Sequence, residues 1–309
     1  MSDSQMCFNL HSLTYSAGDW IKGEINLKIE TKLLGNHLYL QLKGIEEVTH
    51  KKPTPLKVQD IILDYNLKIH EWPNGKISPG DYVFPFEVYL PKDIPSSTSI
   101  STTSLEINLS YSLIAQLDSS ISSSSSISVQ SYQDFPTSLN KNDSIIDLKS
   151  CFCFKRKTID FVASIKKYAY NCNEIVKLQI EGICDSMPNV EIFLVRNLMV
   201  NINENLIVEK DKLCKITTNL NCIDIDLKAF ESRLKFQTTS RGKNFSCSYC
   251  FVIIGITDAM CFREIPEIQL WVVINPVITA PSIPSYHGAW RPKRMHSIRF
   301  EDNNFNMEN

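Results

Sequence analysis

The chain has 309 residues, too many for one ordinary β-sandwich, and its length favours two domains of roughly 150 residues each. Hydrophobic residues make up 43% and charged residues 21% of the chain, a composition that can bury real cores and excludes a disordered protein. The formal net charge of -2 shows no general basicity, so nucleic acid is not an expected partner.

The N-terminus carries neither the basic segment nor the apolar core of a secretory signal. No apolar run approaches the roughly 18 residues that a membrane-spanning helix needs. We therefore expect a cytoplasmic protein. Its 10 cysteines are expected to be free thiols that pack as small apolar side chains in a reducing compartment.

The first half of the chain alternates apolar and polar residues with a period of two, which is typical of strands with one buried and one wet face. Between residues 21 and 29, for example, the odd positions are apolar or glycine and the even positions are polar. The pattern predicts a buried face and an exposed face. The predicted buried residues are Phe84, Phe86, Leu109 and Tyr111, the predicted exposed ones are Lys22, Glu24, Asn26, Lys28 and Glu106, and the predicted strands are 21–29, 38–42, 61–69, 82–90 and 105–117.

Two segments in the middle of the chain lack this alternation. Residues 119–128 contain the serine run Ser122 to Ser126, and we predict a flexible hairpin loop there, with a phosphorylated serine cluster as the alternative. Residues 131–150 are polar and are predicted to be the linker between two domains.

The second half repeats the alternation, and no convincing helix of ten or more residues is found. The fold class is therefore predicted to be all-β, with two tandem immunoglobulin-like β-sandwich domains. The predicted division is an N-terminal sandwich at 1–130, the linker at 131–150, a C-terminal sandwich at 151–280 and a disordered basic tail at 281–309.

Two basic clusters are candidate contact sites for an acidic or phosphorylated partner. Lys51 and Lys52 occupy a predicted loop, and Arg291, Lys293 and Arg294 lie in the tail. A solvated surface is the simpler interpretation of both clusters. The tail could also touch anionic lipid weakly, at about 1 kcal/mol per cation.

The sequence offers no recognisable chemistry for catalysis, because it lacks nucleophile-elbow, zinc-protease, dinucleotide and phosphate-loop motifs. We predict a protein that binds other molecules, without enzymatic activity, cofactor or metal. Cys247 and Cys250, with Cys151 and Cys153, could supply four zinc ligands. Strand alternation, however, puts Cys247 and Cys250 on opposite faces, which favours packed thiols.

A series of motifs resembles those of the arrestin superfamily. The resemblance covers roughly residues 8 to 278 and is most specific in the first half. In the second half, Cys151-Phe-Cys153 resembles the entry to an α-arrestin C-domain, and in Tyr170-Asn-Cys-Asn-Glu174 an asparagine replaces the motif glycine. The first-half motifs are Tyr15-Ser-Ala-Gly18-Asp19 with Gly23, Leu40-Gln-Leu42-Lys-Gly44-Ile-Glu46, Gly80-Asp-Tyr82-Val-Phe84-Pro85-Phe86 and Leu109-Ser-Tyr111.

The resemblance implies the two-domain arrestin fold and a cytosolic adaptor in membrane-protein trafficking, endocytosis and protein transport. Such a protein binds membrane cargo or receptor tails, links them to ubiquitin ligases or to coat and sorting machinery, and is recruited to the plasma membrane or endosomes. The chain lacks the Pro-Pro-x-Tyr motif that usually contacts the ligase, and Pro284-Ser-Tyr286 is only a fragment of it. A retromer-subunit-like endosomal sorting component and a β-sandwich scaffold outside trafficking remain alternatives.

Overall fold

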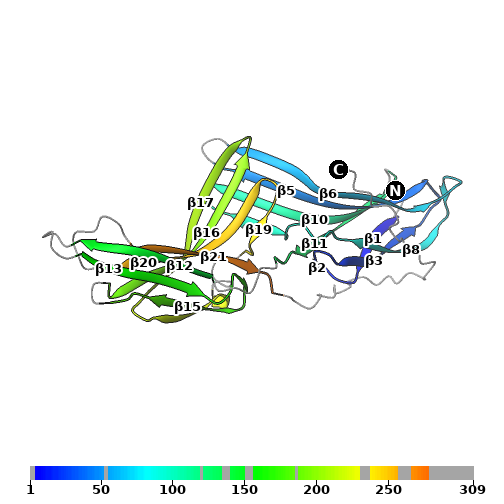
Figure 1. Ribbon diagram of the computed structural model, residues 1–309. Coiled ribbons are helices and arrows are strands. Elements are labelled where there is room, and N and C mark those ends of the chain that lie inside the picture. The colour runs from blue at the N-terminus through cyan, green and yellow to red at the C-terminus, as the bar shows by residue number, and fades with distance from the viewer. Residues whose placement is uncertain are drawn as a thin grey trace, which may run out of the picture. The chain divides into compact units, whose positions relative to one another are not determined.

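The protein is all-β, as the alternation predicts, and divides into two compact units that meet in sequence between Ser131 and Tyr132 (Figure 1). The computed structural model describes residues 4–51, 55–118, 121–133, 140–149, 156–184, 187–229, 237–256 and 266–277, with the side chains of 143–149 and 156–160 excepted.

The described residues of the first unit form two main sheets. A three-stranded sheet has the order β1-β3-β8, and a six-stranded sheet has the order β2-β11-β10-β5-β6, with β9 beside β10. A short pair, β4 and β7, lies outside both sheets. The strands are β1 (Gln5–Leu10), β2 (Thr14–Ser16), β3 (Trp20–Ile29), β4 (Leu33–Leu34), β5 (His37–His50), β6 (Leu56–Glu71), β7 (Lys76–Ile77), β8 (Gly80–Tyr89), β9 (Thr98–Ser101), β10 (Leu105–Leu117) and β11 (Ile121–Gln130).

The core of the first unit lies on the faces that the alternation predicts. Every odd position of β10 is buried, from Leu105 to Leu117, and Phe84 and Phe86 of β8 are buried as well. β8 has a single partner in its sheet, and such an edge strand suits Pro85, which has no backbone N–H to donate.

The predicted wet face of β3 is only partly correct. Lys22 is exposed, whereas Glu24 and Lys28 are half-buried. Asn26 is buried, which contradicts the prediction. Its cross-strand neighbour on β8, Val83, is buried too. The face of the sheet that was predicted to be exposed is therefore shielded from solvent at these two residues.

The serine run is not a loop. Ser122 to Ser126 belong to β11 and pair in antiparallel register with Gln116 to Ser112 of β10. Serine has the same backbone N–H and C=O groups as other residues and can form the same hydrogen bonds between strands. Pairing with β10 outweighs the weak strand propensity of serine. The prediction of a long flexible hairpin loop was therefore wrong.

The described residues of the second unit form a four-stranded sheet of order β12-β13-β15-β18 and a six-stranded sheet of order β14-β21-β20-β16-β17, with β19 beside β20. β16 and β17 make a long antiparallel hairpin (Figure 1). The strands are β12 (Asn140–Lys149), β13 (Arg156–Ile165), β14 (Ala169–Asn171), β15 (Ile175–Glu181), β16 (Asn189–Ile202), β17 (Asn205–Thr218), β18 (Cys222–Asp226), β19 (Ser240–Arg241), β20 (Phe245–Ile256) and β21 (Glu267–Asn275).

Strand β12 lies inside the segment 131–150 that was expected to be a linker. It pairs with β13 along its whole length, from Asn140 opposite Ile165 to Lys149 opposite Arg156. The sequence of this segment lacks alternation, but an edge strand needs only backbone pairing with one neighbour. The linker prediction is corrected for residues 140–149.

The two units repeat one topology. In the first, β2 runs parallel to β11 and β3 pairs with β1 and β8. In the second, β14 runs parallel to β21 and β15 pairs with β13 and β18. The orders of the two six-stranded sheets correspond strand by strand. Tyr15 of β2 and Tyr170 of β14 therefore occupy equivalent positions, and each is buried.

Candidate ligand-binding site in the second unit

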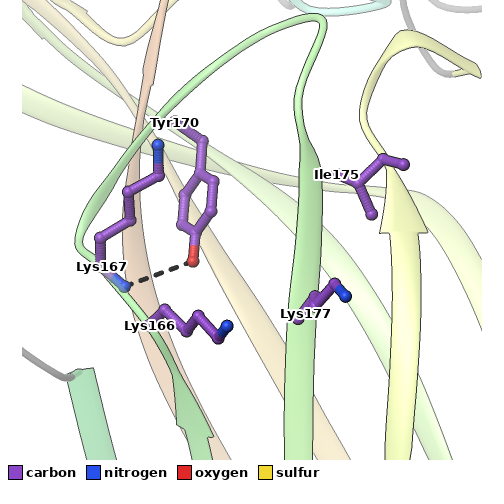
Figure 2. Close-up of a pocket in the computed structure, with 5 residues that line it drawn as sticks. All are labelled: Lys166, Lys167, Tyr170, Ile175 and Lys177. Carbon is purple, nitrogen blue, oxygen red and sulfur yellow. Dashed lines mark hydrogen bonds between the residues drawn. The ribbon is translucent and has the colours of Figure 1, made fainter.

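A recess of about 260 Å³ opens in the second unit, and three lysines line it (Figure 2). Lys166 and Lys167 follow the end of β13, Tyr170 lies on β14, and Ile175 and Lys177 lie on β15. These five residues are called the lysine recess. The chain turns sharply from β13 into β14 and again into β15, and these two turns bring cations from separate segments together (Figure 2).

On one side of the lysine recess, Tyr170 and Lys167 are held in place by interactions with each other and with Glu174. The Lys167 ammonium lies 4.8 Å from the centre of the Tyr170 ring, and its backbone N–H donates to the Tyr170 hydroxyl at 3.4 Å. The same ammonium is ion-paired with Glu174, which also accepts a hydrogen bond from Asn171 at 2.9 Å. Burial raises the pKa of Tyr170, so its hydroxyl stays neutral at physiological pH.

Lys166 and Lys177 line the solvent-exposed side of the recess. Ile165, the last residue of β13, pairs with Leu178 of β15, and the same antiparallel register brings Lys166 across from Lys177. Both side chains are exposed. Among the described residues, no carboxylate lies within ion-pair distance of either ammonium group. Two cationic side chains thus lie just beyond the end of the β13–β15 pairing and line the same recess.

An opposing charge on this sheet is Asp224. It pairs in register with Lys177 on the other flank of β15, and it is exposed. Asp226, also exposed, pairs with Ile175. Both carboxylates lie on β18, outside the residues that line the lysine recess. The lining itself is cationic and apolar, a combination suited to an anion with an attached apolar group.

The equivalent position in the first unit has no such cluster of cations. Leu10 pairs with Gly23, and the next pair along, His11 and Lys22, corresponds to Lys166 and Lys177. Lys22 forms an ion pair of 3.2 Å with Glu87 of β8. The first unit therefore carries one neutralised lysine where the second unit carries two unpaired ones and a third beside them.

Lys51, one of the candidates from the sequence, is engaged within its own unit. Its ammonium donates to the Ser101 hydroxyl at 2.9 Å and to the Thr102 carbonyl at 3.1 Å, and it lies 3.6 Å from the Glu106 carboxylate. A ligand would have to replace these contacts. The other candidates, Lys52, Arg291, Lys293 and Arg294, lie outside the described residues.

The cysteines of the Cys-x-x-Cys segment have the facing predicted from alternation. Cys247 lies beside the Tyr249 hydroxyl at 3.6 Å, whereas Cys250 packs on the other face of the sheet against Phe193 and Val195. Burial raises the pKa of Cys247 to about 11 and also raises that of Cys250, so both are neutral thiols at physiological pH. Cys151 and Cys153 lie outside the described residues, and within those residues no group of three metal-ligating side chains converges.

The sequence contained a usable signal for the lysine recess. Tyr15 and Tyr170 are the first residues of two related motifs. When these motifs are aligned, His11-Ser12 corresponds to Lys166-Lys167 and Lys22 corresponds to Lys177. The alternation of each strand shows only that Lys177 is exposed. Finding the site required the comparison of the two motifs across the repeat.

Comparison with known proteins identifies the fold. Residues 5–132 match the family model of the arrestin (or S-antigen) N-terminal domain. The whole structure resembles squid arrestin, with a TM-score of 0.54 and 11% sequence identity, covering 91% of this chain and 99% of that one. The molecule is thus a two-domain β-sandwich protein with the arrestin fold. Its first unit matches the arrestin N-terminal domain family in sequence, and the two units together have the arrestin fold.

No match was found among curated protein sequences. None of the described residues forms a helix of the length and apolarity that crossing a membrane would require.

Proposed function

We propose that the protein is a cytosolic adaptor that binds the cytoplasmic tails of membrane cargo or receptors and links them to sorting, coat or ubiquitination machinery. The observation that carries this proposal is the arrestin fold, found over both units and supported independently by the sequence match of the first. Arrestins are adaptors that bind receptors and lack enzymatic activity, which supports a general adaptor role without catalysis.

The surface of the two units supports a binding function. β6 and β17 are long strands that have one neighbour each in their sheets. β17 has no buried side chain along its 14 residues, and Leu206 and Val208 are more than half exposed. An edge strand of this kind can accept an extended peptide as an additional strand, while side chains beside it provide specificity.

Affinity purification of the tagged full-length chain from cells, followed by mass spectrometry, tests the proposal. We expect membrane proteins together with ligase or coat subunits, recovered in amounts well below the bait because adaptor contacts are transient. Recovery of retromer subunits in equal amounts would replace the proposal with a stable endosomal sorting complex. Recovery of neither group would favour a scaffold outside trafficking.

A further inference from the structure

The six-stranded sheet of the second unit is buried on both faces at its centre. In β16 the four consecutive residues from Ile192 to Val195 are all buried, and in β20 so are the three from Tyr249 to Phe251. In the first unit the strand equivalent to β20 is β10, which alternates without a break, and its other face is polar apart from Ile114. The shared topology therefore does not require a largely apolar outer face.

A separate hydrophobic cluster lies on this outer side of the sheet, with Phe193, Val195 and Cys250 at its centre. Residues that pair in register share a face of a sheet, so Trp271 of β21, opposite Cys250, extends the cluster on one side. Towards the turn of the β16–β17 hairpin it is extended by another in-register pair, Met199 and Val208. The outer apolar face is defined here as Phe193, Val195, Met199, Val208, Cys250 and Trp271.

Lysines of β17 cover part of the outer apolar face. Lys212 pairs in register with Val195, and Lys215 pairs with Phe193. The two ammonium groups lie 4.3 Å and 5.8 Å from the centre of the Phe193 ring. Lysine side chains commonly lay their apolar stems over such surface while the charged head stays near water. At Phe193 the cover thus includes exposed side chains that can move aside.

The unpaired charge at this border is positive. Lys215 is ion-paired with Glu191 at 2.6 Å, whereas neither Lys210 nor Lys212 forms an ion pair with another described residue. The other carboxylate of this face, Glu267, is on β21, three strands and about 14 Å away from β17. A partner that covers the outer apolar face therefore gains most by placing its own carboxylates beside β17.

The dimensions of the outer apolar face suit a helix. Along β16 it extends from Phe193 to Met199, about 20 Å. A helix of about 13 residues has this length, and its side chains at i, i+3, i+4 and i+7 form one apolar stripe. Phe193 and Val195 in the middle are buried, whereas Met199, Val208 and Trp271 around them are 41%, 51% and 50% exposed. Side chains that project from a helix can displace the lysine stems and reach the buried middle.

We propose that the outer apolar face binds an acidic amphipathic helix of a partner protein. The apolar stripe of the helix packs against Phe193, Val195 and Trp271, and its carboxylates pair with Lys210 and Lys212. The lysine stems that lie over Phe193 in the free chain turn outward to meet these carboxylates. The inference rests on the proposed adaptor role, for which it names one contact surface and the class of partner.

The chemistry of the face favours this partner over a membrane or a second copy of the chain. Binding to a bilayer surface needs apolar side chains that protrude, and here Phe193 and Val195 are buried. A second copy would bring a further row of lysines to the interface, and like charges across an interface repel.

Selection from a display library tests the inference. Random sequences of about 15 residues, or four helical turns, are sorted on the purified full-length chain after depletion on Met199→Glu/Val208→Glu. Both substituted residues are exposed, so this variant is expected to fold. We expect the enriched sequences to carry apolar residues at i, i+3, i+4 and i+7, with aspartate or glutamate beside them.

Fluorescence anisotropy and circular dichroism of an enriched peptide give the quantitative readout. The peptide should gain helix on binding, and Lys210→Gln/Lys212→Gln should weaken its binding roughly tenfold, because two charge-assisted contacts are lost. Rising salt should weaken binding too. Ile61→Glu is the matched control, since Ile61 is 55% exposed on β6, the equivalent edge strand of the first unit, and affinity should not change.

The inference is overturned if no acidic amphipathic sequences are enriched, or if Ile61→Glu weakens binding as much as the lysine variant. Enriched sequences that alternate with a period of two would indicate strand addition at the β17 edge and would also overturn it.

Two further arms examine the other occupants. If vesicles containing phosphatidylserine bound the wild type but not Met199→Glu/Val208→Glu, and no peptide did, the face would contact a membrane and the inference would fall. A dimer in sedimentation velocity that this variant abolishes would likewise replace the helix with a second copy. Recovery of trafficking partners from cells is a separate readout, so failure of this face and failure of the adaptor role are distinguishable.

Discussion

Two motif glycines owe their identity to close neighbours on adjoining strands. Gly44 of β5 pairs with Tyr111 of β10, and a Cβ atom at Gly44 would lie 2.8 Å from the Tyr111 ring. A Cβ atom at Gly23 of β3 would lie 2.9 Å from the Asn9 carbonyl oxygen and from the Leu10 side chain of β1, and 3.2 Å from the Phe86 ring of β8. Both glycines thus leave room for atoms of the neighbouring strands.

The first prediction follows from Gly44. In Gly44→Ala, the new methyl group overlaps the Tyr111 ring, whose hydroxyl is fixed by a 2.7 Å hydrogen bond to the Pro95 carbonyl. The free energy of unfolding should fall by about 1–3 kcal/mol, the usual cost of overpacking. Chemical denaturation measures this loss, and Ser110→Ala on the exposed face of β10 is the control. Equal stability of the two variants would show that Tyr111 moves freely.

The second prediction concerns pH and His70. The His70 ring packs 4.5 Å from Trp72 and 5.1 Å from Phe84, and burial lowers its pKa below the ordinary value of about 6.5. The folded state therefore favours neutral His70, whereas the unfolded state takes up a proton near pH 6.5. Stability from this group is complete above about pH 6.5 and is lost as pH falls from there through the lower folded-state pKa.

Denaturation between pH 8 and pH 5 compares the wild type with His70→Phe, which keeps the aromatic packing and cannot titrate. The free energy of unfolding should decline less steeply towards acid in the variant. Parallel curves for the two proteins would contradict a lowered pKa at this position.

At the scale of elements, the turn between β10 and β11 is held by Asp118. This residue adopts a positive φ of 43°, and its carboxylate accepts hydrogen bonds from the backbone N–H groups of Asn36 at 2.6 Å and His37 at 3.2 Å. The turn is thereby tied to the start of β5, which is the other neighbour of β10.

Asp118→Ala removes both hydrogen bonds and the side chain that tolerates the left-handed conformation. We expect the free energy of unfolding to fall by about 1–3 kcal/mol. Asp118→Asn keeps one acceptor oxygen and the same backbone tolerance, and should lose less. The order of the three unfolding midpoints in urea checks this, and an alanine variant as stable as the asparagine variant would argue against a role for the hydrogen bonds.

The sequence predicted those elements whose side chains alternate and missed those held by backbone pairing. Leu105 to Leu117 alternates without a break, and β10 has these bounds. The serines of β11 and the polar strand β12 carry no alternation, and backbone pairing with the adjacent strands β10 and β13 sustains them. Ile61 of β6 illustrates a third case: the register shift after Gly44 interrupts the alternation, and this side chain is 55% exposed.

The candidate site was harder to predict because its residues are ordinary surface lysines in the sequence. Lys166 and Lys177 become a pair only through the register of β13 with β15. The sequence indicated Lys51 as a candidate in the same way. In the structure its ammonium group donates hydrogen bonds to Ser101 and Thr102 and is ion-paired with Glu106. Whether a lysine is free or paired depends on cross-strand neighbours, and a single sequence does not specify these.

At the scale of the whole molecule, one topology occurs twice with different surfaces. The shared features are the short parallel strand that carries each tyrosine and the order of the six-stranded sheets. The differences, above all the lysines of the second unit, are where the function of a repeated scaffold is expected to lie. An adaptor can in this way use one unit mainly for stability and the other for a ligand.

Proximity labelling with the full-length chain in cells, combined with fractionation, tests the adaptor role most directly. The account predicts that a fraction of the protein sediments with membranes and that membrane proteins and trafficking factors are labelled. A protein that stays wholly in the soluble fraction and labels no membrane protein or trafficking factor under any stimulus would contradict the account.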